Sequence, residues 1–124
     1  MSNRILDSSC WIEIFSSGDK SSKCEKYLKS SEKVFIPTII CYEVYKKIRT
    51  KVSEDKALSA ISFLSQFELV ELDRETALLA ADCSINYKLA MADSTILAHS
   101  LITKSELITM DFDFSSVPDV IVIK

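Results

Sequence analysis

The chain has 124 residues, 48% hydrophobic and 27% charged, and its 15 basic and 18 acidic side chains give a net charge of −3. This length fits one ordinary domain, so we expect residues 1–124 to form a single domain with its own core. The single glycine excludes a glycine-rich phosphate-binding loop, and the single histidine excludes a multi-histidine metal site.

The cysteines and the start of the chain indicate a reducing compartment. Cys10, Cys24, Cys41 and Cys83 form no closely spaced pair, so we expect buried thiols rather than a zinc knuckle or a disulfide framework. The first residues lack the basic start and apolar run of a signal peptide. No apolar run approaches the roughly 20 residues that a membrane span needs. We therefore expect a cytoplasmic protein with no membrane partner.

Short apolar runs alternate with longer helical patterns along the chain. We expect strands at residues 5–6, 34–36, 69–72, 107–109 and 120–123. The expected helices span residues 8–15, 21–29, 38–52 with Thr38 as cap, 53–64, 73–89 and 93–102. Strands alternating with helices predict an α/β fold whose central parallel sheet of four to five strands has helices on both faces.

The apolar spacing also predicts which helix faces are buried. In the helix that Asp73 should cap, a recurring set of apolar residues predicts the core-facing side. That set is Ala77, Leu78, Ala81, Ile85 and Leu89.

Acidic residues follow two predicted strands and occupy two predicted helices. Asp7 ends the first strand, Asp111 and Asp113 follow the fourth, Glu43 lies early in one helix and Asp93 begins another. In a parallel sheet these positions share one edge, where ligands bind. Carboxylates crowded there would raise one another's pKa values unless a cation lay between them. Oxygen ligands without histidine suit Mg²⁺ or Mn²⁺ and metal-assisted phosphoryl chemistry.

Each acid also has a purely structural interpretation. Asp7 and Asp93 could cap helices, and Asp111 or Asp113 could form a turn. Glu43 could pair with Lys46 or Lys47 on a solvated helix face.

The charge distribution adds modest support for a metal site. Residues 90–124 hold 2 basic and 5 acidic side chains and so carry the whole net charge of −3. The basic stretch at residues 46–51, Lys-Lys-Ile-Arg-Thr-Lys, follows Glu43 on its helix. This stretch could guide a polyanion toward a metal, or it could be an ordinary solvated face.

Four segments in order give the chain a family resemblance. They are residues 5–13 (ILDSSCWIE), 36–47 (IPTIICYEVYKK), 89–98 (LAMADSTILA) and 107–114 (LITMDFDF). With these segments the sequence resembles the PIN-domain ribonucleases, specifically the VapC-type toxins of type II toxin–antitoxin pairs.

The resemblance implies a role for each matching residue. Asp7, Glu43, Asp93 and Asp111 would be the catalytic acidic quartet, with Asp7 and Asp93 as the main metal ligands. Glu43 and Asp111 would bind through water or hold a second metal. Outside the quartet, Ser8 and Thr109 would hydrogen-bond to the ligands. Asp113 is either an additional ligand or an anchor of its loop. His99 would be a helix-face residue rather than a catalyst.

The implied function is that of a Mg²⁺- or Mn²⁺-dependent endoribonuclease that acts as a toxin. Its partners would be an RNA substrate, a cognate antitoxin protein and a second copy of the chain, with residues 21–29 and 52–66 as candidate dimer and antitoxin surfaces. Two alternatives stay open at this point. One is a non-catalytic PIN-like module that binds RNA or protein, and the other is a phosphatase that uses the Asp-x-Asp of residues 111–113 as its nucleophile.

Overall fold

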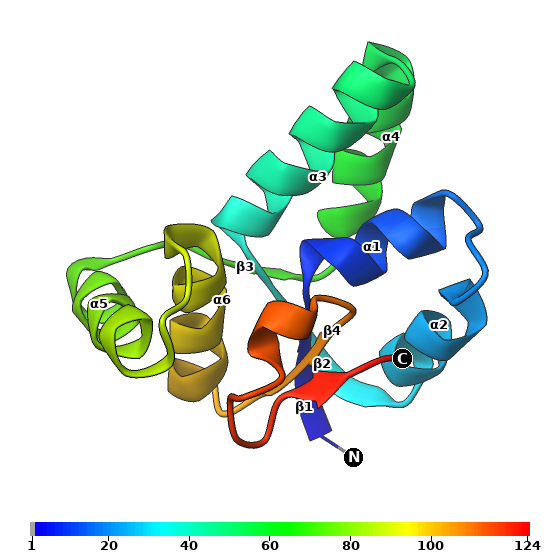
Figure 1. The fold of residues 1–124 in the computed structure, drawn as a ribbon. Helices are drawn as coiled ribbons and strands as arrows, with labels where there is room; N and C mark the ends of the chain where they lie inside the picture. The colour runs from blue at the N-terminus through cyan, green and yellow to red at the C-terminus, as the bar shows by residue number, and fades with distance from the viewer. Residues whose placement is uncertain (1) are drawn as a thin grey trace.

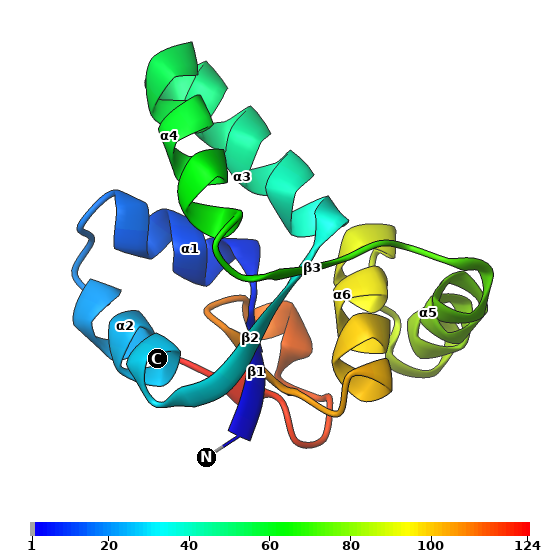
Figure 2. The same ribbon diagram turned by 180° about the vertical axis from the view of Figure 1, so that it is seen from behind.

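A five-stranded parallel sheet forms the centre of the computed structural model, which describes residues 2–124 (Figures 1 and 2). The strands are β1 (Ser2–Leu6), β2 (Ser31–Pro37), β3 (Glu68–Val70), β4 (Glu106–Thr109) and β5 (Ile121–Val122). Their order across the sheet is β3-β2-β1-β4-β5, and every neighbouring pair is parallel. The predicted α/β class is confirmed. The third strand begins one residue earlier and ends two residues sooner than predicted.

Six α-helices and one short 3₁₀ helix connect the strands. They are α1 (Ser8–Phe15), α2 (Ser21–Lys29), α3 (Thr38–Lys51), α4 (Glu54–Leu64), α5 (Arg74–Tyr87), α6 (Met91–Ile102) and the 3₁₀ helix η1 (Phe112–Phe114). Helices α1 and α2 cover one face of the sheet, and α6 covers the other with α5 outside it (Figures 1 and 2). Helices α3 and α4 pack together as an arm that projects beyond the sheet.

Helix starts follow the capping chemistry at some positions and depart from it at others. Ser53 and Asp73 cap α4 and α5, because their side-chain oxygens accept hydrogen bonds from the backbone N–H groups three residues on. The prediction that Thr38 caps α3 was wrong, since the cap position is Pro37 and makes no side-chain hydrogen bond. Asp93 is not a cap either, because α6 begins two residues earlier.

The core is a continuous apolar cluster between the sheet and its helices. The largest fully buried side chains are Trp11 on α1 and Phe114 on η1. Trp11 also belongs to an aromatic group with Phe15, Phe63 and Phe67, whose neighbouring ring centroids lie 5.5 to 6.2 Å apart. Edge-on and tilted aromatic pairs at this spacing add about 0.5–1.5 kcal/mol each to the area they bury. The group therefore ties the base of the α3–α4 arm to α1.

The predicted core face was wrong within α5 and correct only at Leu89, which is buried just beyond the end of the helix. The buried residues of α5 are Thr76, Ala80 and Cys83, whereas Leu78 and Ile85 are 64% and 76% exposed. Helix α5 packs on α6 through small side chains. The larger apolar side chains on the opposite side therefore face solvent.

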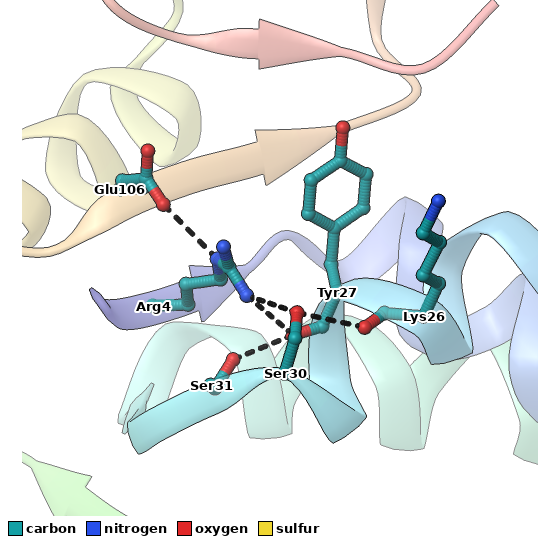
Figure 3. A network of polar contacts seen from close by, with 6 residues as sticks. All are labelled: Arg4, Lys26, Tyr27, Ser30, Ser31 and Glu106. Carbon is teal, nitrogen blue, oxygen red and sulfur yellow. Dashed lines mark hydrogen bonds and ion pairs between the residues drawn. The ribbon is translucent and has the colours of Figure 1, made fainter. Parts of the chain in front are cut away.

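A polar network joins α2 to the sheet at the amino ends of the strands (Figure 3). Arg4 on β1 pairs with Glu106 on β4 at 3.0 Å and donates to the Tyr27 carbonyl and the Ser30 hydroxyl at the end of α2. Its guanidinium also lies 5.3 Å from the centroid of the Tyr27 ring. The bond to the Tyr27 carbonyl satisfies an acceptor that the helix end leaves unpaired, and the three contacts together fix α2 against β1.

All four cysteines are free, three of them buried and Cys41 half-buried, as predicted. Over residues 2–124, none of the helices combines the length and the apolar character that crossing a bilayer requires.

Candidate metal centre

The register of β1 and β4 places Asp7 beside Thr109. Leu6 lies opposite Ile108, so the residues that follow them, Asp7 and Thr109, lie side by side at the carboxyl edge of the sheet. The Asp7 N–H donates to the Ile108 carbonyl at 2.8 Å, and the Thr109 hydroxyl donates to Asp7 Oδ2 at 2.7 Å. The other carboxylate oxygen, Oδ1, accepts from the Ser8 N–H at 2.8 Å. Asp7 is therefore buried and fixed in one orientation by both strands and by the start of α1.

A second hydroxyl, that of Ser9, joins the two loops at this edge. It accepts from the Met110 N–H at 3.0 Å and lies 3.4 Å from both Asp7 Oδ2 and Thr109 Oγ1. The Asp111 N–H donates to Thr109 Oγ1 at 2.9 Å. Thr109 and Ser9 thus hold the backbone that carries Asp111 next to Asp7.

Asp93 completes a group of three carboxylates. It lies in the first turn of α6, the helix that precedes β4 in the chain. One oxygen from each of Asp7, Asp93 and Asp111 lies within 4.8 Å of the other two. Three residues separated by up to 104 positions in sequence therefore meet at one point.

Glu43 lies at the same edge, outside this three-residue group. It is in the second turn of α3, and its Oε1 accepts from the Ser8 hydroxyl at 3.1 Å. Among residues 2–124, no ion pair joins Glu43 to Lys46 or Lys47. The interpretation of Glu43 as half of a surface ion pair is therefore wrong, because its hydrogen-bond partner is Ser8, whose N–H also binds Asp7.

Burial and mutual repulsion favour the neutral forms of these acids. Burial raises the pKa of Asp7, and hydrogen bonds from Thr109 and Ser8 only partly oppose it. Burial, followed by the charge of Asp7, raises the pKa of Glu43. Burial together with the charges of Asp7 and Asp111 raises the pKa of Asp93 to about 7. A cation among these carboxylates would remove the repulsion, and an all-oxygen donor set fits Mg²⁺ or Mn²⁺.

A cavity of about 830 Å³ opens from the acidic group along α1 and α3. The acids Asp7, Glu43, Asp93 and Asp111 all belong to its lining. The rest of its lining includes Ile12 and Glu13 on α1, Met110, and Tyr42, Lys46, Lys47, Thr50 and Lys51 on α3. The four acids and Lys46, Lys47 and Lys51 of the basic stretch therefore line one groove.

The remaining predicted residues lie at the margin or outside. Asp113 is exposed on η1, and its backbone N–H donates to Asp111 Oδ1 at 2.9 Å. His99 is buried in α6, six residues beyond Asp93, and burial lowers its pKa. The sequence analysis missed Ser9. The only signal in the sequence was that Ser9 is a second hydroxyl residue directly after Asp7 and Ser8.

The family model of the PIN domain matches residues 4–120. Curated protein sequences contain no match.

Solved structures match over nearly the whole chain. A toxin–antitoxin complex from Klebsiella pneumoniae has a chain that is 26% identical, with a TM-score of 0.79 and 96% of each chain covered. The Mycobacterium tuberculosis toxin VapC20, described as cleaving the sarcin-ricin loop, is 16% identical, with a TM-score of 0.79 and coverage of 96% of this chain and 98% of that one. DNA-bound VapBC from Salmonella typhimurium is 16% identical, with a TM-score of 0.76 and coverage of 99% and 98%. The chain belongs to the PIN domain family.

Proposed function

We propose that this protein is a metal-dependent endoribonuclease that acts as the toxin of a toxin–antitoxin pair. The observation that carries this proposal is the convergence of Asp7, Asp93 and Asp111 in a groove that Lys46, Lys47 and Lys51 also line. Membership of the PIN domain family and the likeness to chains of toxin–antitoxin complexes support it.

Asp7, Asp93 and Asp111 would hold Mg²⁺ or Mn²⁺, with Glu43 as a further acceptor. The donor chemistry fits, because all four are carboxylates and three of them already offer oxygens to one point. When bound, such an ion stabilises negative charge on a phosphate and activates water.

Hydrogen bonds within the chain would position the acids for the ion. The Thr109 hydroxyl and the Ser8 N–H each bind one oxygen of Asp7, and together they hold its carboxylate in one orientation. The Ser8 hydroxyl turns Glu43 toward the groove. Thr109 also holds the Asp111 backbone, so one hydroxyl orients two of the proposed ligands.

The antitoxin would occupy an apolar groove between α1, α3 and α4. The groove has a volume of about 340 Å³. Its lining comprises Phe15, Ile48, Val52, Lys56, Ser59, Ala60 and Phe63. An amphipathic helix can bury its apolar face in such a groove. Much of this lining falls within residues 52–66, the segment that the sequence analysis considered for this partner.

A second copy of the chain would pack on α5. Leu78 and Ile85 are exposed on the outer side of this helix, seven residues apart and hence on one stripe. Helix α2 corresponds to residues 21–29, one of the two segments that the sequence analysis named for the dimer and the antitoxin, and its exposed residues include Lys23, Lys26 and Lys29. Dimer interfaces are depleted in lysine at their centres, so the apolar stripe of α5 is the better candidate.

Cleavage of a structured RNA tests the nuclease proposal. The parent protein with Mg²⁺ or Mn²⁺ should cleave internally, and chelation should stop cleavage. Asp7→Asn and Asp93→Asn should each lose at least about 100-fold in rate, since each removes a charge from the proposed cation site. Asp119→Asn, an exposed acid just before β5, is the matched control and should retain full activity.

Equal activity in the parent, Asp7→Asn and Asp93→Asn would contradict the proposed site. Binding of RNA without any cleavage would favour a non-catalytic module. Turnover of small phosphate esters that depends on Asp111, without RNA cleavage, would favour the phosphatase.

A further inference from the structure

One face of α3 continues the groove outward from the acids. Its groove-lining residues recur in pairs one helical turn apart, which places them all on the same side of the helix. They are Tyr42 and Glu43, then Lys46 and Lys47, then Thr50 and Lys51. The helix rises away from the carboxyl edge of the sheet as half of the projecting arm (Figure 1).

Tyr42 is an exposed aromatic residue beside the acidic centre. It directly precedes Glu43 and is 61% exposed, although it lines the groove. The ammonium of Lys46 lies 5.6 Å from the centroid of its ring, so it engages one face of the ring at most. An aromatic ring that faces solvent in a charged groove offers a flat surface on which an unpaired base can stack.

The lysines lie at increasing distances from the acids. At about 1.5 Å of rise per residue, Lys47 is about 6 Å and Lys51 about 12 Å beyond Glu43 along the helix axis. Lys46, Lys47 and Lys51 are all exposed, and Lys46 and Lys47 form no ion pair with Glu43 within residues 2–124. This row can therefore contact successive phosphates of a strand whose scissile phosphate lies at the acids.

Tyr45 shows that not every tyrosine of α3 has this role. It is half-buried against the core, and its hydroxyl accepts from Arg49 at 2.9 Å. Arg49 in turn pairs with Glu54 at 3.5 Å on the side of the arm away from the groove lining. The two aromatic residues of α3 therefore differ: one is bound within the fold and the other is presented to the groove.

We infer that Tyr42 is a stacking platform for an unpaired RNA base next to the scissile phosphate, and that the row Lys46, Lys47 and Lys51 binds the phosphates of the same strand. The inference rests on the proposed nuclease function and adds the conformation of the substrate. Because a base inside a duplex has both faces covered, this site selects single-stranded segments over paired ones.

Binding of a short labelled RNA to the Asp7→Asn protein tests the platform without cleavage. In this background Tyr42→Ala should weaken binding of a single-stranded oligonucleotide by about 5- to 150-fold, the equivalent of one lost base–aromatic stack. Tyr42→Phe keeps the ring and should bind within about twofold of the parent. Leu101→Ala, which truncates an exposed side chain near the end of α6, should bind like the parent.

Annealing the oligonucleotide to its complement should abolish the difference between Tyr42→Ala and the parent. Unchanged affinity in Tyr42→Ala, or equal losses in Tyr42→Phe and Tyr42→Ala, would overturn the stacking role. A change in oligomeric state in Tyr42→Ala with unaltered RNA affinity would also overturn it and assign the ring to a protein contact.

The salt dependence of binding tests the lysine row. Lys47→Gln and Lys51→Gln should each reduce the slope of log K against log salt by about 0.7, the value for one single-strand phosphate contact. Lys29→Gln, an exposed lysine on α2, should leave the slope unchanged. If Lys47→Gln and Lys51→Gln had the same slope as Lys29→Gln, the proposal that this row of lysines contacts phosphates would be contradicted.

The two proposals can fail separately. Cleavage that depends on Asp93, with RNA affinity indifferent to Tyr42, would overturn the platform and leave the nuclease standing. RNA affinity that depends on Tyr42, with no cleavage in the parent protein, would support the platform and reject the nuclease.

Discussion

Asp7 is a buried carboxylate with a hydrogen-bond donor on each oxygen. Ser8 N–H and the Thr109 hydroxyl supply these donors at 2.8 and 2.7 Å. Asp7 also occupies the cap position of α1, so the structural interpretation of this residue is confirmed, and it is compatible with the proposed role as a ligand. The cap fixes the helix start, and the same geometry directs the carboxylate toward Asp93 and Asp111.

Thr109 provides a residue-scale test of this positioning. Thr109→Val keeps the shape but removes the donor to Asp7 and the acceptor for the Asp111 N–H. We expect the affinity for Mn²⁺ or the cleavage rate to fall about 10- to 100-fold, as is typical when a partner of a ligand is lost. Thr109→Ser keeps the hydroxyl and should lie within a fewfold of the parent. Titration calorimetry with Mn²⁺ measures the change, and parent-like affinity in Thr109→Val would contradict the positioning role.

Asp93 provides a test through pH. Its pKa is about 7 in the native state and 3.8 in a model peptide, so between these values the native protein holds more protons than the unfolded chain. The free energy of unfolding of the metal-free protein should therefore fall as pH rises from about 4 to about 7, and Mg²⁺ should restore it most at the upper end.

Melting temperatures at pH 5 and pH 8, in chelator and in Mg²⁺, measure this effect. Asp93→Asn has no proton to lose at this position, so its melting temperature in chelator should decline less between the two pH values. Identical declines in the parent and in Asp93→Asn would show that this carboxyl does not titrate as expected.

At the scale of elements, the boundaries of α1 and α2 were more predictable than the side of α5 that is buried. The predicted spans 8–15 and 21–29 coincide with α1 and α2, because turns at Gly18 and Ser30 interrupt the apolar pattern clearly. The face of α5 could not be predicted in the same way. Its apolar residues Ala77, Leu78, Ala81 and Ile85 mimic a core stripe, but the side that α5 buries carries Thr76, Ala80 and Cys83.

The exposed stripe on α5 leads to a prediction about assembly. Leu78→Glu or Ile85→Glu places like charges opposite each other in a twofold symmetric interface. Each change should weaken the dimer by about tenfold or more and leave the fold intact, since both side chains are exposed. Leu69→Glu makes the same exchange at an exposed leucine on β3 and is the control. Light scattering after gel filtration reports the mass, and dimers of unchanged stability in both α5 variants would place the interface elsewhere.

At the scale of the whole molecule, topology rather than local pattern assembles the site. The sequence identified Asp7, Glu43, Asp93 and Asp111 because acids follow strands or begin helices in an alternating α/β pattern, and the four-segment resemblance supplied their order. It could not show that Glu43 stands outside the group of three, since that depends on where α3 leaves the sheet edge. Nor could it show that Tyr42 faces the groove while Tyr45 packs inward, since this depends on how α3 docks.

The most direct test of the account is the position of a bound ion. Crystals grown with Mn²⁺ should give an anomalous peak between the carboxylates of Asp7, Asp93 and Asp111, and crystals of Asp93→Asn should lose that peak or show it greatly weakened. A strong Mn²⁺ peak elsewhere, with none among these three carboxylates in a protein that cleaves RNA with Mn²⁺, would contradict the proposed centre.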